Sequence, residues 1–314
     1  MGSRHLLASF GPEKNEGSLD STRNDKMLIE SHAHLDYPDF ARDLDDVLRR
    51  ANEAGVTRII TIGTSIESSR RAVDLAEKYS NIYAVIGVHP TYAEQAEEDV
   101  MTPLREFAKS RRVVAIGETG LDYHHLPSVE AAKGKKVQVF ARALQGETEE
   151  EIEANIQDGS YKSRQASLFQ QQLDLATELG FNVVIHQRDA WDDTLEIMRP
   201  YSGRLHGVFH CFGGTLEQAN EVLDLGHLVS FTGIVTFKNG ASVREVAAQV
   251  PLDKFMVETD CPYLAPAPFR GKRCEPAHTR LVAESIGTAR SVSLEEVARA
   301  TTATAETFFR FNRS

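Results

Sequence analysis

Cysteine is scarce in this sequence, and its pattern does not suggest disulfide bonds. The 314 residues include three cysteines, Cys211, Cys261 and Cys274. An odd number at wide spacing does not make the disulfide framework of a small secreted protein, and it agrees with a reducing compartment. Cys211 and Cys261 each follow a candidate site residue on an expected strand. Side-chain alternation therefore predicts that both point away from the site and serve in packing.

Long hydrophobic runs are also missing. No apolar stretch approaches the roughly 20 residues that a membrane-spanning helix needs. Near the start only residues 6–10 (LLASF) are mostly apolar, which is shorter than the core of about 7 to 15 residues in a signal peptide. We therefore expect a cytoplasmic protein without a membrane segment. Residues 1–26 are polar and lack an apolar period, so we expect a flexible leader, with Met27 as an alternative start.

Basic residues are outnumbered by acidic ones. The sequence has 35 Lys and Arg against 46 Asp and Glu, for a net charge of -11. Non-specific binding to duplex DNA depends on clustered Lys and Arg, which argues against a broad DNA-coating surface. Any nucleic-acid chemistry must then be local, with metal ions supplying the positive charge. No G-x-G-x-x-G or G-x-x-x-x-G-K-[ST] segment follows an expected strand, which excludes the usual dinucleotide and nucleoside-triphosphate sites.

The order of apolar segments predicts an α/β protein. Short runs rich in β-branched residues alternate with segments of helical spacing, such as residues 44–51 and 73–79. Eight such alternations in about 280 residues are typical of a single (β/α)8 TIM barrel, here over residues 27–314, with an open doubly wound sheet as the alternative. The expected strands are residues 28–35, 58–64, 82–89, 113–121, 181–187, 207–212, 228–235 and 255–260.

One connection between strand and helix is unusually long. It spans residues 124–163 after the fourth strand, and it contains a basic cluster from Lys133 to Lys136 and an acidic run from Glu147 to Glu153. Connections of this length are usually lids or disordered insertions. Two interpretations stay open: a lid that selects substrate, or a solvated insertion without function.

A single acid interrupts the most apolar strand. Residues 113–123 read VVAIGETGLDY, in which Gly117 and Gly120 flank Glu118. Strands tolerate glycine mainly at bulges and close approaches, so the run is expected to be irregular there. A buried carboxylate persists only when it is paired or bound to metal. Glu118 therefore needs partners from other strands.

Histidines and one further acid supply those partners at other strand ends. The carboxyl ends of barrel strands meet on one face, where barrels build their sites. His32 and His34 are two residues apart, so both leave the same face of a strand, roughly 6 to 7 Å apart, and can bind one ion. His227 precedes a strand and is left out. The complete set of candidate metal ligands is His32, His34, Glu118, His186, His210 and Asp260.

Six segments, in order from Met27 to the end, resemble the successive motifs of the TatD family of metal-dependent hydrolases. They are residues 31–36 (SHAHLD), 87–90 (GVHP), 117–123 (GETGLDY), 184–190 (VIHQRDA), 210–214 (HCFGG) and 258–264 (ETDCPYL). The resemblance implies an amidohydrolase-like metal barrel. Characterised members of the family are Mg-dependent deoxyribonucleases, often with 3′ to 5′ exonuclease activity. The insertion after the fourth strand is longer than the family usually has there.

The resemblance also implies two metal sites. One metal is held by His32, His34 and Asp260, a second by His186 and His210, and Glu118 bridges both. Two divalent ions such as Mg, Zn or Mn can together bridge a hydroxide and hold a phosphate oxygen during an in-line displacement.

Further roles are predicted on the same face. Asp260 can accept the proton of the attacking water or serve as a ligand only, and His89 can donate to the phosphate or leaving oxygen or act as a cap. Arg188 can clamp a phosphate bidentately or pair with a neighbouring acid. Arg270 and Arg273, in the loop after the eighth strand, are candidate substrate contacts. Glu258 is expected to support the ligands from the same strand.

Together these features predict a metal-dependent hydrolase of phosphodiester bonds. The resemblance implies a 3′ to 5′ exodeoxyribonuclease, and the acidic net charge favours single-stranded DNA ends over duplexes as its substrate. We expect the protein to be a monomer. The alternative is a metal-barrel hydrolase of a small amide, lactone or other ester. Such barrels often bridge two metals with a modified strand-end lysine, and no lysine ends an inner strand here. Because all six ligand positions are filled, a binding protein that has lost its chemistry is disfavoured.

Overall fold

Eight parallel strands form a single sheet in the order of the sequence, β1 to β8. The computed structural model describes residues 27–96, 99–132 and 149–311. All eight predicted strands are present, although six end earlier than expected because their last residues leave the ladder and enter loops or, after β7, a 3-10 helix. The strands are β1 Leu28–Ala33, β2 Val56–Ile62, β3 Ile82–Ile86, β4 Val113–Asp122, β5 Asn182–Arg188, β6 Gly207–Phe209, β7 Leu228–Phe231 and β8 Phe255–Val257.

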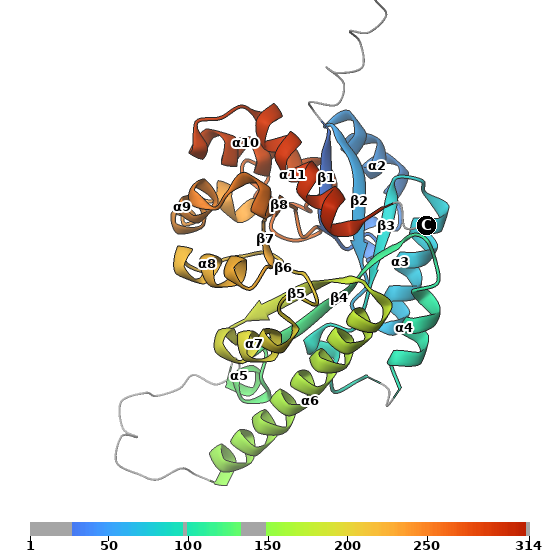
Figure 1. The fold of residues 1–314 in the computed structure, drawn as a ribbon, viewed down its shortest axis with the longest axis vertical. Helices are drawn as coiled ribbons and strands as arrows, with labels where there is room; N and C mark the ends of the chain where they lie inside the picture. Colours follow the sequence, from blue (N-terminus) through green and yellow to red (C-terminus); the bar gives the residue numbers. More distant parts are fainter. Residues whose placement is uncertain (1–26, 97–98, 133–148, 312–314) are drawn as a thin grey trace, which may run out of the picture.

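Helices alternate with the strands and surround them (Figure 1). No helix among the described residues is both long and apolar enough to cross a membrane. The helices are α2 Leu44–Glu53, α3 Ile66–Lys78, α4 Met101–Phe107, α5 Pro127–Ala132, α6 Glu149–Leu179, α7 Trp191–Met198, α8 Leu216–Asp224, α9 Ala241–Gln249, α10 Thr279–Arg290 and α11 Leu294–Phe309. Short 3-10 helices occupy Pro38–Phe40, Pro90–Tyr92, Arg199–Tyr201, Gly233–Thr236, Leu252–Lys254 and Pro276–His278.

The sheet nearly closes on itself just beyond the end of β8. The backbone N–H of Asp260 donates to the carbonyl of His32 at 3.0 Å, and that of His34 donates to the carbonyl of Cys261 at 2.8 Å. The predicted (β/α)8 barrel is thereby confirmed and the open doubly wound sheet is excluded. The closing contacts join the segments that carry three of the predicted metal ligands.

An apolar layer fills the barrel interior below the site. Side chains such as Ile29, Ile60 and Val184 pack there with Phe308 and Phe309 of α11. The Asn182 side chain donates to the carbonyl of Phe308 at 2.6 Å, which ties α11 to the start of β5. Because this layer fills the lower part of the barrel, polar side chains gather at the carboxyl ends of the strands.

The described part of the predicted insertion is helical. Residues 127–132 form α5 and residues from 149 onward belong to α6, whose amino-terminal half extends past the barrel in Figure 1. Glu and Ala in this stretch favour a helix. The Gln165 side chain of α6 accepts from the N–H of Asp122 at 2.9 Å and donates to its carbonyl at 3.1 Å, so α6 fixes the end of β4. The basic cluster from Lys133 to Lys136 and the leader 1–26 lie outside the described residues.

Candidate metal centre and substrate pocket

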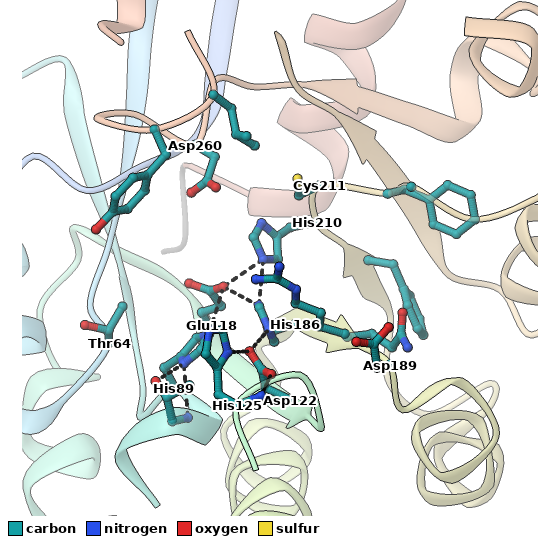
Figure 2. A pocket seen from close by; sticks show the side chains of 18 of the residues that line it. Thr64, His89, Glu118, Asp122, His125, His186, Asp189, His210, Cys211 and Asp260 are labelled. Carbon is teal, nitrogen blue, oxygen red and sulfur yellow. Dashed lines mark hydrogen bonds and ion pairs between the residues drawn. The ribbon is translucent and has the colours of Figure 1, made fainter. Parts of the chain in front are cut away.

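The six predicted ligands meet at the carboxyl face of the barrel. His32, Glu118 and His186 belong to β1, β4 and β5, and His34, His210 and Asp260 follow β1, β6 and β8. Figure 2 shows Glu118 pointing toward His186 and His210, with Asp260 facing the same space. Three groups of these side chains lie close enough to hold an ion: His32, Glu118 and His210; His32, His34 and Asp260; and His89, Glu118 and His186.

The first cluster surrounds one carboxylate oxygen of Asp260. Its Oδ1 lies 3.3 Å from Nε2 of His34 and 3.8 Å from Nε2 of His32. Oε2 of Glu118 lies 3.5 Å from Nε2 of His32 and 3.8 Å from Nε2 of His34. Two imidazole nitrogens and two carboxylate oxygens therefore converge on one point.

The second cluster uses the other oxygen of Glu118. Its Oε1 lies 2.7 Å from Nε2 of His210 and 2.9 Å from Nδ1 of His186. Nε2 of His89 lies 3.5 Å from the same oxygen. One carboxylate thus serves two clusters, one through each oxygen.

The donor set fits divalent cations. Both ring nitrogens of the buried His32 lack a hydrogen-bond partner among the described residues. A buried nitrogen without a partner is costly, and a bound cation would satisfy one of them. Imidazole nitrogens suit Zn, Mn or Fe, and the carboxylate oxygens with room for water suit Mg. His32, His34 and Asp260 would hold one ion, His186 and His210 another, and Glu118 would contact both.

The carboxylates of the centre are held in their ionised form. Burial alone would raise the pKa of Glu118, but the surrounding histidines, led by His210, outweigh it and hold this pKa well below its usual value. Burial would also raise the pKa of Asp260, but hydrogen bonding to His34 outweighs it and lowers this pKa. Ionised carboxylates are the form that binds cations.

Two glycines on either side of Glu118 allow β4 to approach β5 closely. A Cβ atom on Gly117 would lie 2.4 Å from the carbonyl oxygen of Val184, and one on Gly120 would lie 2.0 Å from that of His186. Both glycines have positive φ, +127° and +146°. The pairing of β4 with β5 shifts register between Ile116 and Thr119, as the glycine pattern predicted.

Sequence reasoning missed Asp122 and His125. Oδ2 of Asp122 lies 3.2 Å from Nε2 of His186 and 2.9 Å from Nδ1 of His125. Burial opposes the ionised form of Asp122, but hydrogen bonding to His186 lowers its pKa far more. The signal was present, because Asp122 is four residues beyond Glu118 on the same strand and period-2 alternation places both on one face.

Two buried glutamates support the ligands from below. Oε1 of Glu258 accepts from the backbone N–H of Cys211 at 2.7 Å and lies 3.7 Å from Nδ1 of His210, which places it in the predicted supporting position. Glu30, which the sequence did not single out, accepts from the backbone N–H groups of His32 and Thr259, both at 3.0 Å. These contacts orient the His210 ring and the backbone segments that carry the candidate ligands.

His89 faces the centre while it caps a short helix. Its Nδ1 accepts from the backbone N–H of Thr91 at 3.2 Å. Burial, with help from His186, lowers the pKa of His89 to about 3, so the ring is neutral. A neutral ring that accepts at Nδ1 carries its hydrogen on Nε2. That N–H points toward the centre.

The three predicted arginine contacts lie in different places. Arg188 is exposed and lines the pocket, and its guanidinium has no hydrogen bond or ion pair among the described residues. Arg270 instead stacks over Phe237 at 3.5 Å, outside the pocket lining. The Arg273 guanidinium binds both oxygens of Asp43, at 2.8 and 2.7 Å, and Glu275 at 2.8 Å. The structure thus places Arg188 in the pocket and Arg273 in an ion-pair network beside α2.

The prediction for Cys211 was wrong. Its side chain lines the pocket instead of pointing away from it (Figure 2). The reason is that β6 ends at Phe209 and Cys211 has a positive φ of 49°, so strand alternation no longer applies. Cys261 is fully buried, and its predicted packing role is confirmed.

The clusters form the floor of an open pocket with a volume of about 1260 Å³. Its walls include Tyr37 and Tyr263, which follow β1 and β8, Tyr92, which follows β3, and Arg188 and Trp191 at the carboxyl end of β5. None of the described residues that line it is a lysine. The pocket is large enough for a substrate of nucleotide size.

Comparison with known proteins places the chain among metal-dependent hydrolases. The model of a family described as TatD related DNase matches residues 29–310. The chain is 36% identical over 287 residues to the uncharacterized metal-dependent hydrolase YabD of Bacillus subtilis, which covers 91% of this chain and 100% of the relative. It is 31% identical to the 3'-5' ssDNA/RNA exonuclease TatD of Citrobacter koseri, with 90% of this chain and 98% of the relative covered.

A solved structure gives the same result. The crystal structure of YJJV, a TatD homolog from Escherichia coli K12, superposes with a TM-score of 0.75 at 28% identity, covering 92% of this chain and 99% of the other. The chain therefore belongs to the TatD related DNase family of metal-dependent hydrolases.

Proposed function

We propose that this protein uses two divalent cations to hydrolyse phosphodiester bonds in single-stranded DNA, removing nucleotides from the 3′ end. The observation that carries the proposal is the position of Glu118, which faces one cluster with each oxygen. A carboxylate shared between two ligand sets is suited to the paired ions of phosphodiester-cleaving enzymes. The name of the Citrobacter koseri relative supports the single-stranded substrate and the direction.

Bound cations would neutralise the phosphate and stabilise the charge that develops during in-line displacement. The chain's own residues then position the reactants. Asp260 is only 16% exposed at its side chain and is ionised, so it can accept the proton of the attacking water. His89 presents its Nε2–H and can donate to a phosphate or leaving oxygen. Arg188 can bind a phosphate with two parallel hydrogen bonds because its guanidinium is free of other partners in the described structure.

Charge and shape favour the end of a strand as the substrate. With a net charge of -11 the protein offers little attraction to a long duplex, so its contact with phosphate should be short. The centre lies at the floor of a pocket ringed by loops, which admits a free end more easily than the middle of a duplex. We expect slow cutting of duplexes and only a shallow loss of affinity as salt rises.

The decisive experiment compares substrates after the metal content has been controlled. The purified protein is stripped with EDTA, reloaded with Mg, Mn or Zn, analysed for bound metal, and tested on linear and closed circular single strands of one sequence. We expect two ions per chain, no activity without metal, and cutting of the linear strand only. Activity that survives exhaustive chelation would exclude metal-ion catalysis. Equal cutting of both substrates would exclude end recognition.

A further inference from the structure

The two walls of the pocket differ in chemistry. Tyr37 and Tyr263 follow β1 and β8 and lie on the wall beside His34 and Asp260, and Tyr92 follows β3, between that wall and β5 in the order of strands. The facing wall, at the end of β5, carries Arg188, which is free of partners in the described structure. Strands β1 and β5 lie across an eight-stranded barrel from each other. One wall therefore carries an exposed tyrosine, and the other offers a cation beside Trp191.

Exposed aromatic surface is concentrated at this pocket. Among the described residues the exposed large hydrophobic side chains are Tyr92, Ile156, Tyr263 and Phe269. Two of these four line the pocket, with Tyr263 54% exposed and Tyr92 39% exposed. Neither ring is needed to cover the core, so their position at the mouth calls for another explanation.

Tyr263 is held in place by contacts with the metal centre. Its backbone N–H donates to the carbonyl of Asp260 at 3.0 Å. Its ring meets that of Tyr37 edge to face, with centroids 6.4 Å apart, and Tyr37 in turn stacks on His34 with centroids 4.8 Å apart. The ring is thus fixed next to a candidate ligand while half of its surface stays accessible. A rigid aromatic surface of this kind binds planar groups at low entropic cost.

We propose that Tyr263, together with Tyr92, forms a stacking subsite for a nucleobase of the nucleotide at the cut phosphodiester. The subsite rests on the proposed function, because it needs a phosphate at Glu118. With that phosphate between the clusters and within reach of Arg188, the sugar and base extend toward the opposite wall, where Tyr263 is exposed. Stacking accepts every base through its π-face, which suits an enzyme that must remove successive nucleotides of any sequence.

The test measures how much the enzyme depends on the base itself. Single-stranded oligonucleotides carry either a normal residue or an abasic residue at the terminal or the penultimate 3′ position. The metal-loaded full chain is compared with Tyr263→Ala, Tyr263→Phe and Tyr92→Ala. Phe269→Ala is the matched control, because Phe269 is an exposed aromatic of the same loop that stacks on His278 and does not line the pocket.

We expect the wild type to prefer the base over the abasic residue about tenfold in kcat/KM at one of the two positions. Tyr263→Ala should bring this ratio close to one, Tyr92→Ala should lower it in part, and Tyr263→Phe and Phe269→Ala should preserve it. An equal loss by Tyr263→Ala on both substrates would overturn the subsite, because it would mean that Tyr263 acts only by positioning Asp260. A wild-type ratio near one would overturn it as well. If no metal restores cleavage of any DNA, the proposed function itself is wrong.

Discussion

Glu30 connects the two segments that close the barrel beneath the first cluster. It is fully buried, and its Oε1 accepts from the backbone N–H groups of His32 and Thr259, both at 3.0 Å. Its Oε2 forms a 2.5 Å hydrogen bond with the hydroxyl of Thr279, at the start of α10. These bonds supplement the few backbone contacts between β1 and the chain after β8. We predict that Glu30 is a main source of stability at this seam.

The expected magnitude follows from the groups that would lose a partner. Glu30→Ala leaves two buried N–H groups unpaired, and each costs about 1 to 3 kcal/mol. We therefore expect a loss of roughly 4 kcal/mol in the free energy of unfolding, which in a chain of this size corresponds to a melting temperature lower by about 10 °C. Glu30→Gln keeps one oxygen for both N–H groups and an amide donor for Thr279, so it should cost less than about 1 kcal/mol.

The assay is urea unfolding followed by circular dichroism. EDTA is present throughout, so that metal binding does not add to the stability of the folded state. The amide variant separates the hydrogen bonds from the shape of the side chain. The reasoning is refuted if Glu30→Ala unfolds within about 1 kcal/mol of the wild type, or if Glu30→Gln loses as much as Glu30→Ala.

Three further predictions concern single side chains. Glu118→Gln should keep the fold but lose activity and bind less than two ions per chain, as measured by metal analysis; near-normal rates would contradict the two-cluster centre. Burial lowers the pKa of His227 to about 4, so the unfolded state takes up a proton that the folded state refuses as pH falls below about 6.5. In His227→Asn the amide oxygen can still accept from the N–H of Gly207, but no side chain titrates at this position. Between pH 7 and pH 5 this variant should therefore lose about 2 kcal/mol less of its free energy of unfolding than the wild type. Identical pH profiles of stability for the two proteins would disprove this. His89→Gln, which retains a donor near Nε2, should keep more of kcat than His89→Asn, which retains only the cap to Thr91; equal kcat values would show that His89 does not donate.

Local patterns in the sequence were enough to predict the barrel and a set of candidate ligands that meet on one face of it. Alternating strand and helix periods depend on which side chains are buried, and burial follows directly from apolar residues along the chain. Parallel strands in a barrel bring their carboxyl ends to one face, so residues that end apolar runs, such as His186 and Asp260, could be expected to meet without coordinates. Glu118 stood out for the same reason.

Only the tertiary structure showed which atoms of these residues meet. The assignment of each Glu118 oxygen to a different cluster depends on how β4 approaches β5. The choice between Arg188 and Arg273 depends on Asp43, which is 230 residues away in the sequence and, together with the nearby Glu275, occupies the guanidinium of Arg273. No local period in the sequence records that two residues so far apart meet. The buried contacts of Glu30 and the position of Tyr263 at the mouth likewise arise where the two ends of the barrel join.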